Sequence, residues 1–441
     1  MFRNGSPNSG SGRFDRIACL GLTWMVLLLN GVATWADDRS SPTDLSIDCQ
    51  KRSRQYDFPI CVVKYGPFEG IFAVDTGHTR TFALEPQELV ENPEKDWRIL
   101  DEQFQFASGL GSTKLIRGIP ISVFGRPARL SDISYRANDP RNKGASRLHG
   151  FVGVQDLLEC PFRMYLNRSI CEPYTGNAAD FKVSAPIFLD SANVPTIQVS
   201  FPALTPKSVV LDTGLGWFIA IPDSKIDIFV KCGIAKEAGT TEASNTMGLH
   251  LVKCYILREV KVGDYVFHDV DAVSWPHNRI GLGTDFFRHF DCVFDFPERQ
   301  LRLKPEDDAW PKTVPPDASG LVTAFDEDGT LLVARVHSRN VVTAKVLRPD
   351  DVIMKFDGKS ASEYTYLQIK DRLCEAGTTV PLRIRRKGKE FDVDLKLSYP
   401  FEYPPKWGDV IEPTDPSELF EKHLSDSIKK RDERAKKNVP R

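Results

Sequence analysis

The sequence predicts a mainly β protein made of two duplicated lobes and a smaller third domain. The first indication is composition: 30 Gly and 30 Pro among 441 residues favour many turns and short strands over long helices. The second is an internal repeat, in which two landmarks recur in the same order about 130 residues apart. The third is a new order of strands and helices that begins near residue 319.

Residues 1–36 have the form of an export signal. Arg3, Arg13 and Arg16 precede an apolar run over residues 17–36 that ends in small residues suited to cleavage. The run is also long enough to span a bilayer, so an uncleaved membrane anchor is the alternative. In both cases we expect an exported protein, periplasmic or extracellular, which touches a membrane only if the segment is not cleaved.

Charge and cysteine usage restrict the partners. The formal net charge is −2, so the chain has no overall basic field for nucleic acid. The acidic residues lack His or Cys neighbours at ligand spacing, so we expect no metal and no cofactor. The eight Cys beyond the signal permit disulfides in an exported chain, and the sequence separations favour Cys160 with Cys171 and Cys232 with Cys254.

The repeat consists of two apolar strands that each run into an Asp-Thr-Gly turn. The first turn is Asp75-Thr76-Gly77, and the second, Asp212-Thr213-Gly214, follows 137 positions later. A Gly-rich apolar segment follows each turn, at residues 150–158 and 280–287. Each half is then expected to contain a Gly-bearing hairpin and an alternating strand, and the second half closes with a hairpin over residues 290–303.

The region after the repeat has a different pattern. Pro and Asp residues at 305–318 predict a linker. Beyond it we expect strands, a short helix near 342–346, and a helix over 362–376 that ends at Gly377. A final hairpin should turn at Lys387-Gly388. The charged end contains a helix start at Asp415.

These patterns divide the chain into six parts. They are a signal peptide (1–36), a first lobe (47–180), a second lobe (181–304), a linker (305–318), a third domain (319–398) and a charged tail (401–441).

Two aspartates in equivalent turns suggest acid–base chemistry. Like charges held close together cannot both ionise freely, so Asp75 and Asp212 would share one proton. One carboxylate then takes a proton from a water molecule while the other carboxyl group donates one to the substrate. A single Asp-x-Gly is an ordinary β-turn, and it is the duplication that favours a paired site. Such a site needs no metal.

Residues 60–172 and 195–303 resemble the aspartic protease clan, and the ending IGLGTDFFRHFDCVFDFPERQLRL looks closer to bacterial retropepsin-like domains than to pepsins. The resemblance implies two duplicated retropepsin-like β-barrel lobes that form a pepsin-like pseudo-dimer in one chain. It implies an aspartic-type endopeptidase with Asp75 and Asp212 as the catalytic pair, acting on protein or peptide substrates. Thr76, Gly77, Thr213 and Gly214 would support the catalytic loops, with the two threonine hydroxyls interlocking.

The sequence departs from the family directly after each turn. The family usually has Ser, Thr or Ala there, whereas this chain has His78 and Leu215. His78 is therefore a candidate for tuning the pKa of the aspartates; the alternative is a ring that points outward and has no role. A second function also stays open, namely an inactive scaffold that binds peptides in the same cleft.

Residues 319–397 resemble a PDZ domain, through RPDDVI at 348–353, Phe356-Asp357-Gly358, the following helix and the final hairpin. PDZ domains bind extended peptides by adding a strand to a sheet edge. The resemblance implies a peptide partner and a binding loop at Gly320, Leu321 and Val322. This loop lacks the second Gly of the usual Gly-Leu-Gly-Phe pattern.

Overall fold

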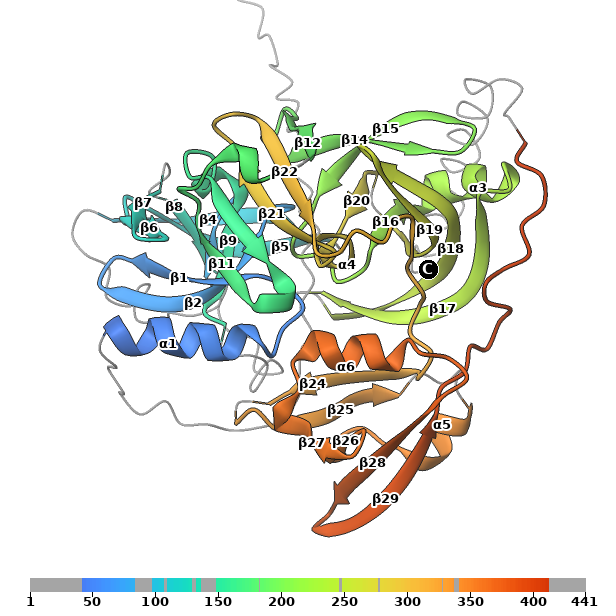
Figure 1. Ribbon diagram of the computed structural model, residues 1–441. Coiled ribbons are helices and arrows are strands. Elements are labelled where there is room, and N and C mark those ends of the chain that lie inside the picture. Colours follow the sequence, from blue (N-terminus) through green and yellow to red (C-terminus); the bar gives the residue numbers. More distant parts are fainter. Residues whose placement is uncertain are drawn as a thin grey trace, which may run out of the picture.

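The computed structural model describes residues 42–83, 97–106, 109–128, 132–135, 148–181, 183–245, 248–276, 278–326, 328–336 and 341–411. Figure 1 shows two β-rich lobes side by side and a third domain beneath them. The signal peptide and the helix start at Asp415 lie outside the described residues. Within these ranges, no helix is both long enough and apolar enough to cross a membrane.

The first lobe contains a long mixed sheet in the order β4-β5-β8-β3-β9-β2-β1-β6-β7. Its strands are β1 (Ile60–Tyr65), β2 (Phe68–Asp75), β3 (Phe82–Ala83), β4 (Arg98–Phe106), β5 (Gly109–Arg117), β6 (Ile121–Val123), β7 (Arg126–Pro127), β8 (Asp132–Tyr135) and β9 (Gly150–Gly153). Short 3-10 helices follow at η2 (Val154–Asp156), η3 (Leu166–Arg168) and η4 (Ala178–Asp180).

A helix precedes the first strand, where the sequence predicted β structure from residue 47. Helix α1 spans Pro42–Ser53, with a proline at its first position, where the missing N–H costs no hydrogen bond. Asp48 and Arg52, one turn apart, form an ion pair at 2.5 Å that supports the helix. Cys49 packs from it into a small core with Phe58 and other apolar side chains of the lobe.

The second lobe contains a sheet in the order β13-β14-β15-β20-β16-β19-β18-β17. The strands are β13 (Phe188–Leu189), β14 (Pro195–Phe201), β15 (Leu204–Leu211), β16 (Ile219–Pro222), β17 (Ala235–Asn245), β18 (Gly248–Val262), β19 (Tyr265–Trp275) and β20 (Ile280–Leu282), with helices α3 (Asp223–Lys231) and α4 (Thr284–Phe287). The predicted linker is partly structured, because β23 (Lys312–Thr313) pairs in parallel with β19.

The strand that precedes each Asp-Thr-Gly turn has the same neighbours in both lobes. In the first lobe, β2 pairs in parallel with β9, and β9 pairs antiparallel with β3. In the second, β15 pairs in parallel with β20, and β20 pairs antiparallel with β16. The two Gly-rich segments of the repeat therefore lie directly beside the strands that carry the aspartates.

A further sheet joins the lobes. Its order is β11-β10-β21-β22-β12, with β10 (Phe162–Tyr165), β11 (Ile170–Pro173), β12 (Val183–Pro186), β21 (Phe290–Asp295) and β22 (Gln300–Pro305). The predicted closing hairpin is confirmed as β21 and β22. Phe162 of one lobe lies opposite Phe294 of the other, with ring centroids 4.8 Å apart and nearly parallel. Both rings are fully buried in a core shared by the two lobes.

The third domain has its own core and its own sheet, in the order β24-β25-β26-β28-β29. Its elements are β24 (Leu321–Phe325), β25 (Leu331–Val336), α5 (Val341–Val346), β26 (Val352–Phe356), β27 (Lys359–Ser360), η5 (Ala361–Glu363), α6 (Tyr366–Leu373), β28 (Thr379–Arg386) and β29 (Lys389–Lys396). In Figure 1 the β28–β29 hairpin projects away from the lobes and α6 faces them.

Two details of the third domain differ from prediction. The helix expected over 362–376 is split into η5 and α6, because Thr365 caps the second helix in a reciprocal box with Gln368. The helix also ends earlier, at Leu373, with Cys374 as its C-cap, while Gly377 adopts a φ of +83° beyond it. The final turn is confirmed, with Lys387 and Gly388 both at positive φ.

The interlobe aromatic contact predicts a large stability effect. Replacing Phe294 by Ala should lower the free energy of unfolding by about 3–5 kcal/mol, because a fully buried ring is removed from the shared core. Phe188→Ala is a matched control, since that ring is 50% exposed, and it should cost under about 1 kcal/mol. Urea unfolding followed by tryptophan fluorescence measures both, and equal losses would contradict the assignment of this core.

Candidate active site and the adjoining cavity

The two Asp-Thr-Gly turns meet between the lobes and are bonded to each other through their threonines. Thr76 Oγ1 donates to the Leu211 carbonyl at 2.7 Å, and Thr213 Oγ1 donates to the Val74 carbonyl at 2.5 Å. Each hydroxyl also accepts the other threonine's backbone N–H, at 3.0 and 3.1 Å. Because both threonines are fully buried, losing any of these bonds would leave a polar group unsatisfied. The exchange therefore fixes one turn against the other.

This junction places the carboxyl groups of Asp75 and Asp212 face to face. A Cβ built on Gly77 would lie 2.5 and 2.6 Å from the carboxylate oxygens of Asp212. One built on Gly214 would lie 2.7 and 2.9 Å from those of Asp75. Any side chain at either position would displace an aspartate, so each turn requires glycine.

Backbone N–H groups hold each carboxylate in place. Gly77 and His78 both donate to Asp75 Oδ1 at 3.1 Å, and Gly214 donates to Asp212 Oδ1 at 3.0 Å. Both aspartates are fully buried. Burial, and then the charge of Asp75, raise the pKa of Asp212 well above its usual range, against the opposing effect of the N–H donors. The pair therefore retains a proton more readily than two isolated carboxylates would.

His78 contacts Asp75 through its backbone, and its ring is buried rather than turned outward. The ring is 4% exposed, and Nδ1 lies 2.6 Å from the Arg80 carbonyl oxygen. A carbonyl only accepts, so Nδ1 carries the hydrogen. Burial lowers the pKa of His78 to about 4, and the ring is neutral at pH 7. The contribution of His78 to the site is thus its N–H and not a positive charge.

Leu215 occupies the equivalent position in the second lobe and is fully buried in an apolar cluster that includes Val273 and Trp275. Its carbonyl accepts from Thr284 Oγ1 at 3.0 Å and from Thr284 N at 2.7 Å. Thr284 lies within the Gly-rich segment of this lobe and so ties that segment to the second Asp-Thr-Gly turn. No polar side chain is supplied by Leu215 itself.

Neither a metal site nor the predicted disulfides occur in the described part of the chain. No group of three or more His, Cys, Asp or Glu residues there is arranged to hold a metal ion. No disulfide joins Cys160 to Cys171 or Cys232 to Cys254, so the predicted pairs are wrong. For one pair the reason is direction: Cys232 packs into the main core, whereas Cys254 packs beside the cluster around Trp275.

A cavity of about 250 Å³ adjoins the second Asp-Thr-Gly turn, between the second lobe and the third domain. Residues that the sequence assigned to two separate sites line it together, namely Gly214 of that turn and Gly320, Leu321 and Val322 of the third domain. Their common location could not be foreseen, because nothing local in the sequence relates residues about 100 positions apart.

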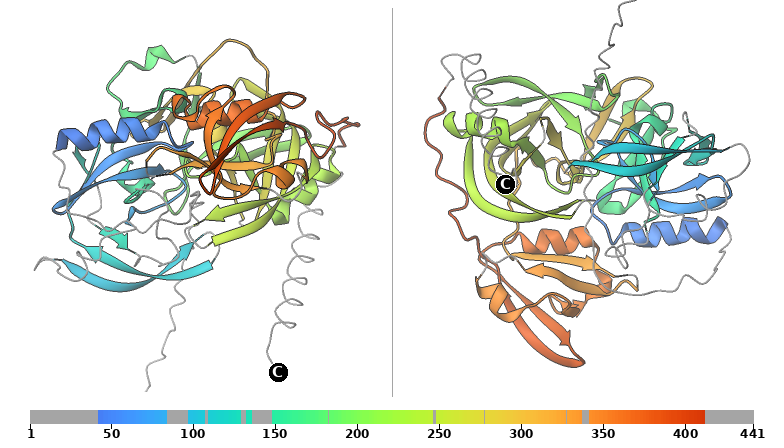
Figure 2. Two further views of the ribbon diagram at one scale, coloured as in Figure 1. Left: turned by 90° about the horizontal axis from the view of Figure 1, so that it is seen from below. Right: turned by 180° about the vertical axis from the view of Figure 1, so that it is seen from behind.

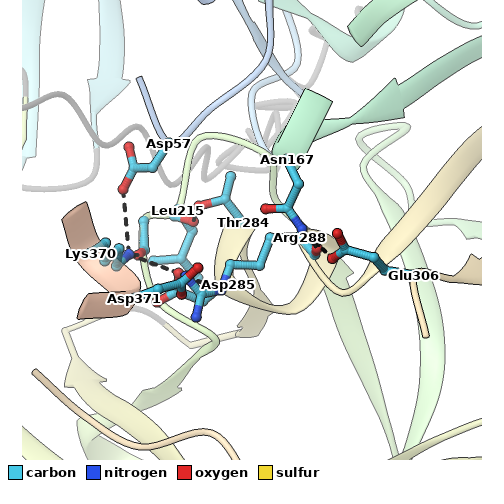
Figure 3. Close-up of polar contacts among 10 residues, drawn as sticks. Asp57, Asn167, Leu215, Thr284, Asp285, Arg288, Glu306, Lys370 and Asp371 are labelled. Atoms are coloured by element: carbon cyan, nitrogen blue, oxygen red, sulfur yellow. Dashed lines mark hydrogen bonds and ion pairs between the residues drawn. The ribbon is translucent and has the colours of Figure 1, made fainter. Parts of the chain in front are cut away.

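One lysine at the edge of this cavity connects the third domain to both lobes, and sequence reasoning missed it. Lys370 Nζ, on α6, lies 2.8 Å from Asp285 Oδ1, 3.5 Å from Asp57 Oδ2 and 3.0 Å from the Gly216 carbonyl. Figure 3 shows Lys370 between Asp57 and Asp285. Burial works to lower the pKa of Lys370, but the two carboxylates outweigh it and raise that pKa, so the ammonium stays charged.

A second set of contacts flanks this lysine. Arg288 of the second lobe pairs with Asp371 of α6 at 2.6 Å. The backbone N–H of Tyr366 donates to the Arg54 carbonyl, at the end of α1, at 2.8 Å. Helix α6 is thus held by the first lobe through Asp57 and the Arg54 carbonyl, and by the second lobe through Asp285, Arg288 and the Gly216 carbonyl. The views in Figure 2 agree in placing α6 against the lobes.

Comparison with known protein families gives one match. Residues 319–397 match the family model described as PDZ domain. This confirms the predicted fold of the third domain, and it associates that domain with peptide or partner binding. The comparison with curated proteins finds no match to the chain.

The raised pKa of Asp212 predicts a pH-dependent stability. A carboxyl group that holds its proton more tightly when folded stabilises the protein when protonated, and this is lost as the pH rises above about 3.8. Asp212→Asn should therefore melt higher than the parent protein at neutral pH, and the difference should shrink towards about pH 4. Calorimetry across this range, with exposed Asp394→Asn as control, tests it. If Asp212→Asn were less stable than the parent protein at neutral pH, the Asp212 carboxylate would not be a destabilising buried charge and the prediction would be contradicted.

The lysine contact predicts a measurable coupling between domains. Lys370→Met should cost about 2 kcal/mol, because Asp285 and Asp57 lose a charged hydrogen-bond partner. Combining it with Asp285→Asn should cost less than the sum of the single changes, since the pair is then removed together. Exposed Lys359→Met is the control. Strictly additive unfolding free energies would show that the contact contributes nothing.

Proposed function

We propose that the chain is an aspartic-type endopeptidase whose two lobes form a pepsin-like pseudo-dimer of retropepsin-like units. The observation that carries this proposal is the reciprocal threonine exchange, which sets Asp75 and Asp212 face to face in equivalent turns. The parallel strand beside each turn, and the sheet that joins the lobes, support the same arrangement.

In the proposed mechanism a water molecule lies between the two carboxyl groups. Asp75, whose Oδ1 accepts two backbone N–H bonds, is the ionised partner and takes a proton from the water. Asp212, whose pKa is raised, is the protonated partner and donates to the carbonyl oxygen of the scissile peptide. The water oxygen attacks the carbonyl carbon, and the tetrahedral species then breaks its C–N bond as the amine gains a proton. No covalent enzyme intermediate is formed.

The PDZ domain supports a role in selecting protein substrates or partner peptides, because domains of this kind bind extended peptides. The N-terminal segment supports export to the periplasm or the extracellular space. Both assignments belong to the proposal, as does the hydrolase activity. A catalytically inactive peptide-binding scaffold is the competing function, and cleavage by the wild-type chain separates the two.

The proposed dyad predicts that either aspartate is indispensable. Asp75→Asn and Asp212→Asn should each lower peptide cleavage by at least about a thousandfold, because neither half of the acid–base pair works alone. Cleavage by the parent chain should fall as the pH rises through the raised pKa of the pair, since the shared proton is lost. Mass spectrometry of a mixed peptide library measures both effects.

Asp394→Asn, a change at an exposed position of the distant β29, is the control and should cleave like the parent. If the parent chain cleaves nothing from acidic to mildly alkaline pH, while all variants remain folded, the scaffold function replaces the protease. If it cleaves and one aspartate variant keeps full activity, the dyad assignment is wrong.

A further inference from the structure

The cavity beside the second catalytic turn has two walls from different domains. The third domain contributes one face of β24 and the facing side of α6, with Val322, Thr323 and Lys370 among the lining residues. The second lobe contributes Gly214 and Trp217 from the catalytic turn and the segment after it. A chain lying in this cavity would contact both the third domain and the turn that holds Asp212.

Strand β24 lies at the end of its sheet. Its only strand partner among the described residues is β25, so no described strand pairs with its other edge. Helix α6 flanks that edge across the cavity, as Leu321 and Tyr366 both line it. A strand edge that lacks a strand partner and lies beside a groove is the geometry that accepts an added strand.

The loop that leads into β24 is already occupied by a carboxylate. Asp317 Oδ1 accepts the backbone N–H groups of Ser319 at 2.9 Å and Gly320 at 2.8 Å. The Ser319 hydroxyl donates to both oxygens of Asp317 at 2.9 and 3.0 Å and accepts the Leu321 N–H at 3.0 Å. Three successive N–H groups, which could otherwise bind the end of a peptide, are therefore satisfied within the chain.

Asp317 also places a negative charge at this position. Burial raises the pKa of Asp317 to about 6, against the opposing effect of its hydrogen bonds, so the group is ionised at neutral pH. The cation of α6 that lines the same cavity, Lys370, is already engaged by Asp285 and Asp57. A free C-terminal carboxylate entering the loop would find its donors taken and a like charge in place.

We propose that this cavity binds an internal, extended segment of a protein substrate along the edge of β24, and does not select free C-termini. Asp317 takes the place that a terminal carboxylate would fill. The bound segment continues towards Gly214, so the third domain extends the substrate site of the proposed protease. The direction of the bound segment towards Gly214 rests on the proposed function, whereas the binding of the segment to the third domain does not.

The test compares two forms of one random library of short peptides, one with free C-termini and one amidated, both labelled at the N-terminus. Binding is measured by fluorescence anisotropy to the full chain carrying Asp75→Asn, so that no peptide is cleaved. The two forms should bind within about twofold of each other. Asp317→Ala, which frees the N–H groups and removes the charge, should make the free-acid form bind about tenfold tighter than the amide.

Asp317→Asn is the matched variant, because its side-chain oxygen still accepts the same N–H groups, and it should leave the two forms nearly equal. Val322→Asp, in the cavity wall, should abolish binding of both forms, whereas exposed Lys389→Glu should not. A strong preference of the parent site for free acids would overturn the proposal. So would binding of neither form, or binding unaffected by Val322→Asp.

The two proposals fail separately in this design. Binding as expected without any cleavage by the wild-type chain would remove the proposed protease and leave the peptide site. Cleavage that depends on both aspartates, without peptide binding in this cavity, would remove only the present inference.

Discussion

The structure depends on the exchange of hydrogen bonds between Thr76 and Thr213. Each hydroxyl donates to a carbonyl of the opposite lobe and accepts an N–H from the opposite turn. Since the groups are buried, neither turn satisfies its own polar atoms without the other. The same exchange holds two carboxyl groups together in a buried environment of low dielectric constant, where their mutual repulsion is strong. The lobes thus hold a destabilising pair of carboxyl groups in place, and the proposed acid–base chemistry depends on that pair.

The rest of the molecule supports this junction from outside. The sheet formed by β10, β11, β12, β21 and β22 joins the lobes behind it, with Phe162 stacked on Phe294. On another side, α6 contacts both lobes through Lys370 and neighbouring groups. The Lys370 ammonium also donates to the Gly216 carbonyl, two residues after the second Asp-Thr-Gly turn. The third domain is therefore in direct contact with the segment that follows Asp212.

Much of the fold followed from sequence, because the pattern was local and repeated. The strands that lead into the turns, the Gly-rich segments and the final hairpin at Lys387-Gly388 were all predictable from periodicity and turn chemistry. Helix α1 was missed, since its short polar sequence gives little periodic signal. The contacts of Lys370 with Asp57 and Asp285 were also missed, because they join three distant segments. The prediction of disulfides from sequence separation was wrong, because two cysteines that are close in sequence need not point their side chains towards each other. The hydrogen bonds by which Asp317 occupies the loop before β24 could not be predicted from the sequence either.

The most direct test of the central claim is a carboxyl titration by NMR, with ¹³C-labelled aspartate in the full chain. The resonance of Asp212, assigned by its loss in the Asp212→Asn variant, should titrate well above the usual aspartate range. Its pKa should fall when Asp75 is replaced by Asn, because the repelling charge is removed. If Asp212 titrates at an ordinary aspartate pKa and ignores the change at Asp75, the two carboxyl groups are not a coupled pair and the account is contradicted.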